Sequence, residues 1–129
     1  MKPIDRETER GAALAEFTFV LPIFVILVFG IIQFGLALNQ VQAYQAAARE
    51  GARVGALQTS SSADINNAVT GSLVGIGGAT PSVTNPSGTC AGRPGQQITV
   101  RVTAPYTIQI PLLPDVSITL EGDGVFRCE

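Results

Sequence analysis

The sequence contains no histidine and no tryptophan among its 129 residues. Histidine is the commonest general base and the commonest metal ligand, so its absence excludes the Ser-His-Asp and Cys-His arrangements of nucleophilic catalysis. Carboxylate chemistry stays open, with Asp115, Glu121 and Asp123 as its candidate residues. We expect a protein that is not an enzyme and that uses no cofactor or metal.

Positive charge is also scarce, and the formal net charge is −2. The eight basic residues are scattered along the chain: Lys2, Arg6, Arg10, Arg49, Arg53, Arg93, Arg101 and Arg127. No basic patch of the kind that binds phosphate backbones is present, so the sequence predicts no nucleic-acid partner.

One long segment carries no charge at all. Phe17 to Leu38 reads FTFVLPIFVILVFGIIQFGLAL, 22 positions without a charged residue. As a helix it would be about 33 Å long, enough to cross a hydrocarbon core of about 30 Å. A secretory signal peptide has a shorter apolar region, of about 7–15 residues. We expect a transmembrane helix over about 17–38, kinked at Pro22, which lacks an amide hydrogen.

The flanks of this segment predict its orientation. Lys2, Arg6 and Arg10 precede it, and no basic residue follows until Arg49. Because lysine and arginine are enriched on the cytoplasmic side of membrane spans, the N-terminus is expected inside and the C-terminus outside. The protein would then cross the lipid bilayer once and expose a small head.

The two cysteines, Cys90 and Cys128, both lie in the expected head. They form no CxxC pair and have no neighbouring zinc ligands. In an exported domain one structural disulfide is expected, which would close a loop of about 39 residues and stabilise the head by roughly 4 kcal/mol. Two free, buried thiols are the alternative.

A charged leader ends at Gly11, and Glu16 follows five residues later, at the start of the apolar run. This pattern resembles the cleavage site of type IV prepilins, which a membrane-bound aspartic peptidase cuts after the glycine. The resemblance implies a cut between Gly11 and Ala12.

A carboxylate among apolar residues costs about 2.5–3.5 kcal/mol at mid-bilayer and less near the edge. After the cut, the Ala12 ammonium of a neighbouring subunit could neutralise Glu16 and set the axial register of an assembly. The simpler alternative is that Glu16 is hydrated at the headgroup level and only ends the span.

The stretch RGAALAEFTFVLPIFVILVFGIIQFGLAL looks like the start of TadE-like proteins of the tight-adherence (Tad) pilus system, and AAREGAR at 47–53 and the ending GVFRCE are similar to that family too. Phe17 departs from the tyrosine usual in the major Tad pilin. This difference and the longer chain favour a minor pilin or pseudopilin, with Glu16 and Phe17 at the position that sets register.

The resemblance implies a pilus-assembly protein that acts in adhesion or secretion. Its expected partners are a prepilin peptidase, the major Tad pilin, other minor pilins and the inner-membrane assembly platform. Its expected location is the bacterial inner (cytoplasmic) membrane and, after assembly, the extracellular pilus. The alternative is an uncleaved, signal-anchored envelope protein with an extracytoplasmic binding domain.

Three regions are expected: a cleaved cytoplasmic leader (1–11), a long helix (12–57) and an exported head (58–129). Beyond the span the helix carries small and apolar residues at spacings of three or four, which share a face: Val41, Tyr44, Ala48, Ala52 and Gly55. This face predicts either a packing surface for neighbouring pilin helices or a contact with the chain's own head.

The head is expected to be α+β. Ser62 or Asp64 would cap a short helix through about Val74, and 75–93 reads as a long loop. Period-two alternation then predicts strands at 98–103, 106–110 and 116–120. Glu121 to Gly124 reads as a hairpin turn into a fourth strand at 125–128. The expected head is a small antiparallel sheet of about three or four strands.

Overall fold

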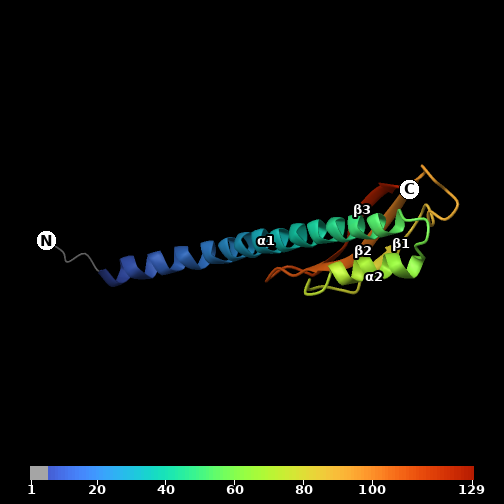
Figure 1. Ribbon diagram of the computed structural model, residues 1–129. Helices are drawn as coiled ribbons and strands as arrows, with labels where there is room; N and C mark the ends of the chain where they lie inside the picture. Colours follow the sequence, from blue (N-terminus) through green and yellow to red (C-terminus); the bar gives the residue numbers. More distant parts are fainter. Residues whose placement is uncertain (1–5) are drawn as a thin grey trace.

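The computed structural model describes residues 6–129, with side chains from Gly11 onward (Figure 1). Residues 1–5 of the predicted leader lie outside this part. The fold is α+β, as predicted, with the following elements in chain order: α1 (Arg6–Gly55), α2 (Ser62–Ser72), β1 (Ser82–Thr84), β2 (Gln97–Ile108) and β3 (Val116–Arg127).

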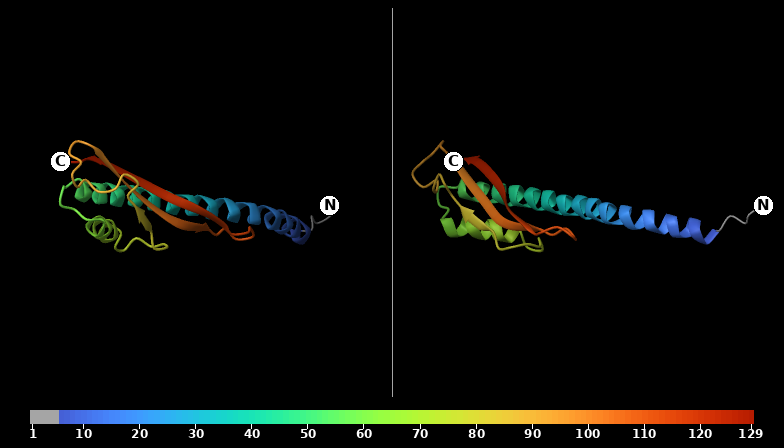
Figure 2. Two further views of the ribbon diagram at one scale, coloured as in Figure 1. Left: turned by 90° about the vertical axis from the view of Figure 1, so that its right-hand side faces the viewer. Right: turned by 180° about the vertical axis from the view of Figure 1, so that it is seen from behind.

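Helix α1 is the axis of the molecule. Its C-terminal half carries α2 and the sheet along its side, whereas its N-terminal half projects beyond them, as the views in Figures 1 and 2 agree. The helix starts at Arg6, inside the predicted leader, and ends at Gly55, two residues before the predicted end. The helix therefore joins the candidate span and the head without a break.

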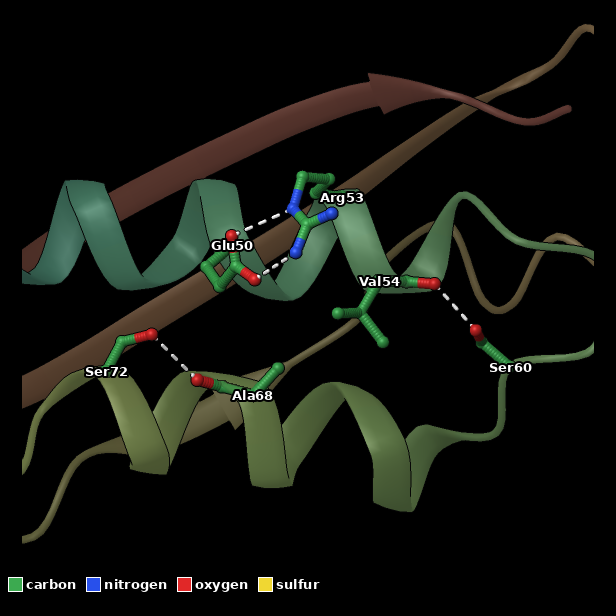
Figure 3. Close-up of polar contacts among 6 residues, drawn as sticks. All are labelled: Glu50, Arg53, Val54, Ser60, Ala68 and Ser72. Carbon is green, nitrogen blue, oxygen red and sulfur yellow. Dashed lines mark hydrogen bonds and ion pairs between the residues drawn. The ribbon is translucent and has the colours of Figure 1, made fainter.

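A short turn links α1 to α2. The hydroxyl of Ser60 donates to the carbonyl of Val54, 2.6 Å away, near the end of α1 (Figure 3). The same carbonyl also accepts from the Leu57 backbone N–H. In α1 itself, Arg53 pairs with Glu50 at 2.6 Å on the exposed side. In α2, the Ser72 hydroxyl donates back to the carbonyl of Ala68.

The start of α2 is a capping box. Ser61, not the predicted Ser62 or Asp64, is the N-cap residue. The Asp64 backbone N–H donates to the Ser61 hydroxyl, and the Asp64 carboxylate accepts from the Ser61 backbone N–H at 2.8 Å. Asp64 thus acts three residues into the helix, because the box needs its acid at that position.

The capping box predicts a pH dependence. The hydrogen bonds from Ser61 hold the pKa of Asp64 below its usual range. A depressed folded-state pKa contributes stability that is present above the unfolded pKa and is lost as the pH falls through the folded value. We expect Ser61→Ala to lower the unfolding free energy by about 1 kcal/mol near pH 7. Thermal unfolding at pH 7 and pH 3 measures this, and a variant whose deficit does not shrink at pH 3 would contradict it.

The sheet has the order β1-β2-β3 and is antiparallel throughout. The strands predicted at 98–103 and 106–110 are one strand, β2, which pairs with β3 along its whole length, from Gln97↔Arg127 to Ile108↔Val116. Pro105 lies inside β2 without interrupting it. On its other side β2 pairs with β1 only at Arg101 to Thr103, so a missing N–H at 105 leaves no partner unsatisfied.

The predicted turn at Glu121 to Gly124 is wrong, since β3 runs unbroken through these residues. Gly122 and Gly124 instead face α1. A Cβ atom on Gly122 would lie 2.5 Å from the backbone carbon of Tyr44, and one on Gly124 would lie 2.2 Å from the carbonyl oxygen of Ala48. A second difference is β1, a short strand inside the predicted loop 75–93.

The core lies between α1, α2 and the inner face of the sheet. The small-residue face of α1 packs on the chain's own head: Tyr44, Ala48 and Ala52 are buried, and Val41 packs against the cluster. Ile65 and Val69 of α2 meet β2 residues at Gly51 and Gly55 of α1, where an added Cβ would clash with them. Of the two readings of this face, contact with its own head is the one observed.

A disulfide joins Cys90 and Cys128, with 5.5 Å between their Cα atoms, as predicted. It fixes the loop before β2 to the residue after β3. The neighbouring backbone continues this connection to the end of α1, because the Glu129 N–H donates to the Ala56 carbonyl and the Gln58 side-chain amide donates to the Glu129 carbonyl.

Candidate functional site

The projecting half of α1 presents an uncovered apolar surface. Phe19 is 79% exposed and Ile23 is 70% exposed, and the most apolar part of the helix has no residue buried in the head. Within residues 6–129, α1 is a helix that is long enough and apolar enough to cross a membrane. The head leaves this surface bare, and a large exposed apolar surface of this kind is typical of a membrane or protein contact.

Gly11 lies inside α1, where glycine is less favourable than alanine by about 1 kcal/mol. Nothing lies within 4 Å of the position that a Cβ atom would occupy, and its backbone is not in the left-handed region. The fold therefore gives no reason for glycine at position 11. By contrast, Gly51 and Gly55 in the same helix are required for close packing.

An open glycine alone does not identify a site. Gly35, also in α1, is equally free of neighbours. What distinguishes Gly11 is the carboxylate of Glu16 five residues later, at the edge of the apolar run. Gly35 has no acidic residue near it in the sequence and serves as a matched comparison for experiments.

Glu16 is exposed and lines a shallow groove of about 290 Å³ together with Ala13, Phe17 and Val20. Among residues 11–129, neither ion pair involves Glu16. Ala12 and Glu16 are four residues apart in α1, so they share a helix face and are separated by one turn. Because the Glu16 side chain is exposed, a charged group of a neighbouring helix can reach it.

Pro22 lies within α1, which continues unbroken on both sides. Because proline has no N–H, the carbonyl of Thr18 loses its usual helix partner. The Thr18 side chain points back and donates to the Leu14 carbonyl at 2.8 Å, so it satisfies its own hydrogen bond within the apolar stretch. The kink at Pro22 stays a prediction.

The carboxylates proposed as catalytic candidates are not assembled into a site. Asp123 accepts two hydrogen bonds of 2.8 Å from the Arg101 guanidinium, which lowers the pKa of that carboxyl. Glu121 lies beside it on the outer face of the sheet, but Asp115 precedes β3 at the opposite end of the strand. In the described part of the chain, no cluster of three metal-ligating residues occurs.

One contact was not anticipated from the sequence. The side-chain amide of Gln33, inside the predicted span, donates to the Gln109 carbonyl at 3.0 Å. The Tyr106 hydroxyl donates to the Gln33 side-chain oxygen at 2.9 Å. The signal was available, since Gln33 is the single strongly polar side chain between Thr18 and Asn39. A polar group in such a position normally has a partner.

Comparison with known proteins finds a match to this region. Residues 11–53 match the family model described as TadE-like protein. The match begins at Gly11 and lies entirely within α1. No curated protein and no solved structure matches the chain.

The TadE-like match confirms the resemblance found in the sequence for this part of the chain. TadE-like proteins are structural rather than catalytic. The match covers the candidate span and the helix face that packs on the head, but not α2 or the sheet. The role of the head therefore has to be argued from its own structure.

Proposed function

We propose that this chain is a minor pilin or pseudopilin of a Tad-type pilus, stored in the inner membrane and cut between Gly11 and Ala12 by a prepilin peptidase. The observation that carries this proposal is that Glu16 follows Gly11 by five residues at the start of a bare apolar helix. Gly11 has no packing role, and the TadE-like match begins there.

The work of α1 in this proposal is physical. Before assembly its apolar surface is buried in lipid, and afterwards it is buried against the helices of the major pilin and other minor pilins. Because the apolar side chains stay out of water in both states, transfer costs little hydrophobic free energy. Polar pairing then decides the register, and Glu16 beside Phe17 is the residue available for it.

The cytoplasmic side holds the N-terminus in this proposal, because Lys2, Arg6 and Arg10 precede the span. A peptidase that cuts after Gly11 would therefore act at the inner face of the membrane. The head, with its disulfide, lies on the opposite side, where disulfides persist. The inner-membrane assembly platform is the expected partner that receives the processed chain.

The first test is the mass of the N-terminus after co-expression with a prepilin peptidase. We expect the natural chain to begin at Ala12 and the Gly11→Ala variant to keep residues 1–11. Gly35→Ala is the matched control, because it removes an equally open glycine from the same helix and should be cut normally. An uncut natural chain, under conditions in which a known prepilin is cut, would leave an anchored binding domain instead.

A substitution at Glu16 tests assembly separately from processing. Glu16→Gln should be cut at Ala12 as efficiently as the natural chain, because the carboxylate is used only after the new ammonium exists. Its recovery in sheared pili should fall, since a neutral amide does not form an ion pair with the Ala12 ammonium of a neighbouring subunit. If Glu16→Gln entered pili at the natural level, the register role would be wrong and Glu16 would only mark the end of the span.

A further inference from the structure

The hairpin that joins β2 to β3 reaches the predicted span. Its tip, the Pro111 to Pro114 segment, lies alongside α1 near Gly30 and Gln33. A Cβ atom on Gly30 would be 3.9 Å from the side chain of Ile110, and Gln33 holds the hairpin by its bond to the Gln109 carbonyl. Gly30 precedes Leu38, the end of the uncharged segment, by about 12 Å of helix.

At the same level along α1, large apolar side chains are exposed. Ile31, Ile32, Phe34 and Leu36 are each at least half exposed. If the bilayer covers them, it must reach past Gly30 on that side of the helix. The hairpin tip is fixed at this level by Gln33 and Tyr106, so it cannot stay in bulk water while these side chains are in lipid.

The tip has the composition of a lipid-facing segment. Between Arg101 and Asp115 no residue is charged. Leu112 is 75% exposed, and Leu113 is about half exposed, so neither packs into the head. Two exposed leucines between prolines have no role in the core of the protein.

Part of the backbone at the tip is satisfied within the protein. Pro111 and Pro114 have no N–H, and the Leu113 N–H donates to the Ile110 carbonyl at 3.1 Å. The Gln109 carbonyl accepts from Gln33, and the Gln109 side chain donates to Asp115. Non-helical backbone with free carbonyls is excluded from the hydrocarbon region, so the tip carbonyls set the headgroup boundary as the limit of its depth.

We propose that the Pro111 to Pro114 tip inserts into the outer leaflet of the membrane, at the boundary between headgroups and acyl chains, and holds the head against the bilayer. This inference rests on the part of the proposed function in which α1 spans a membrane. It does not depend on cleavage at Gly11. Tyr106, half-buried and hydrogen-bonded above the tip, fits the headgroup level, where tyrosine is enriched.

A groove beside the tip supports the lipid as occupant. It has a volume of about 320 Å³ between α1 and the hairpin, and its walls are almost wholly apolar, including Phe34, Ala37, Ile108 and Ile118. The groove continues the bare surface of the span, without a charged residue between them. An acyl chain from the surrounding bilayer is chemically matched to this groove. Water in the groove would instead leave the apolar walls hydrated, which is unfavourable.

The test places an environment-sensitive fluorophore on single engineered cysteines of the full chain in phosphatidylcholine–phosphatidylglycerol vesicles. The two natural cysteines are joined in a disulfide, so only the new thiol reacts. Leu113→Cys reports the tip. Val74→Cys is the matched control, because Val74 is an 83% exposed aliphatic residue that follows α2 and is not part of the β2–β3 hairpin. Ile23→Cys reports whether α1 is in the membrane.

We expect the label at 113 to emit at shorter wavelength than the label at 74, to be quenched by spin-labelled lipid and to be protected from aqueous iodide. A label at 113 that behaves like the one at 74, while 23 is in lipid, would overturn the insertion and leave the anchor intact. Protection from iodide without quenching by lipid would also overturn it, since a second protein copy would then cover the tip. A water-exposed label at 23 would refute the membrane placement of α1 and the insertion together.

Discussion

Replacing Gly124 by alanine will destabilise the head by about 3 kcal/mol or more, which is the upper range for overpacked sites. The added methyl group would lie 2.2 Å from the carbonyl oxygen of Ala48 and 2.3 Å from its carbon. These atoms belong to the backbone of α1 and cannot rotate away as a side chain does. The strand or the helix would have to move as a whole.

Unfolding of the detergent-solubilised full chain measures this effect, followed by the near-ultraviolet signal of tyrosine. Both tyrosines, Tyr44 and Tyr106, lie in or against the core of the head, so the signal is not dominated by the span. Gly71→Ala in α2 is the control, because no atom lies within 4 Å of its added carbon and helix propensity should raise stability by up to about 1 kcal/mol. Equal midpoints for the two variants would disprove the close contact of β3 with α1.

Gly122 and Gly124 also explain why the turn predicted at Glu121 to Gly124 is wrong. Glu121-Gly122-Asp123-Gly124 has the composition of a turn, and local chemistry gives no reason to reject one. The alternative pattern was present, since Leu120, Gly122 and Gly124 occupy every second position and are all buried. Glycine there serves the close approach of a helix backbone, which is a tertiary requirement that no local window contains.

Most of the elements were predictable because their signals are periodic and long. The uncharged run gave the apolar helix, the spacing of small residues gave its buried face, and alternation gave the positions of β2 and β3. The merging of two predicted strands across Pro105 was not predictable, because it depends on β1 being too short to pair there. The partner of the small-residue face also required the tertiary structure, since a second helix would satisfy the same pattern.

For the candidate site, the local sequence pattern was predictable and the tertiary contact was not. The Gly11 and Glu16 pattern was found from the sequence alone, and the structure adds that Gly11 has no packing role. The contact of Gln33 with the β2–β3 hairpin came only from the structure, because the two segments are separated by more than 70 residues. The predicted cleavage position thus came from the sequence. The proposed position of the head against the bilayer depends on a long-range contact.

The second large effect concerns the disulfide. A Cys90→Ser, Cys128→Ser variant should lose roughly 4 kcal/mol of unfolding free energy, because the bridge closes a loop with a sequence separation of 38 residues. In a head of this size that loss corresponds to a fall in melting temperature of roughly 15–30 °C. A small domain with a thin core has little other stability to replace it.

The effect should be concentrated at the end of the head that is remote from the hairpin tip. Cys128 donates its N–H to the Gln96 carbonyl at 2.7 Å, and Glu129 donates to Ala56 at the end of α1. Without the bridge these bonds fray first, so hydrogen exchange at residues 90–96 and 127–129 should accelerate before that of central β2. Reductant supplies the control, because it should lower the natural chain to the level of the variant and leave the variant unchanged. A variant that melts with the oxidised natural chain would show that the connection of Glu129 and Gln58 to α1 holds this end of the head without the bridge.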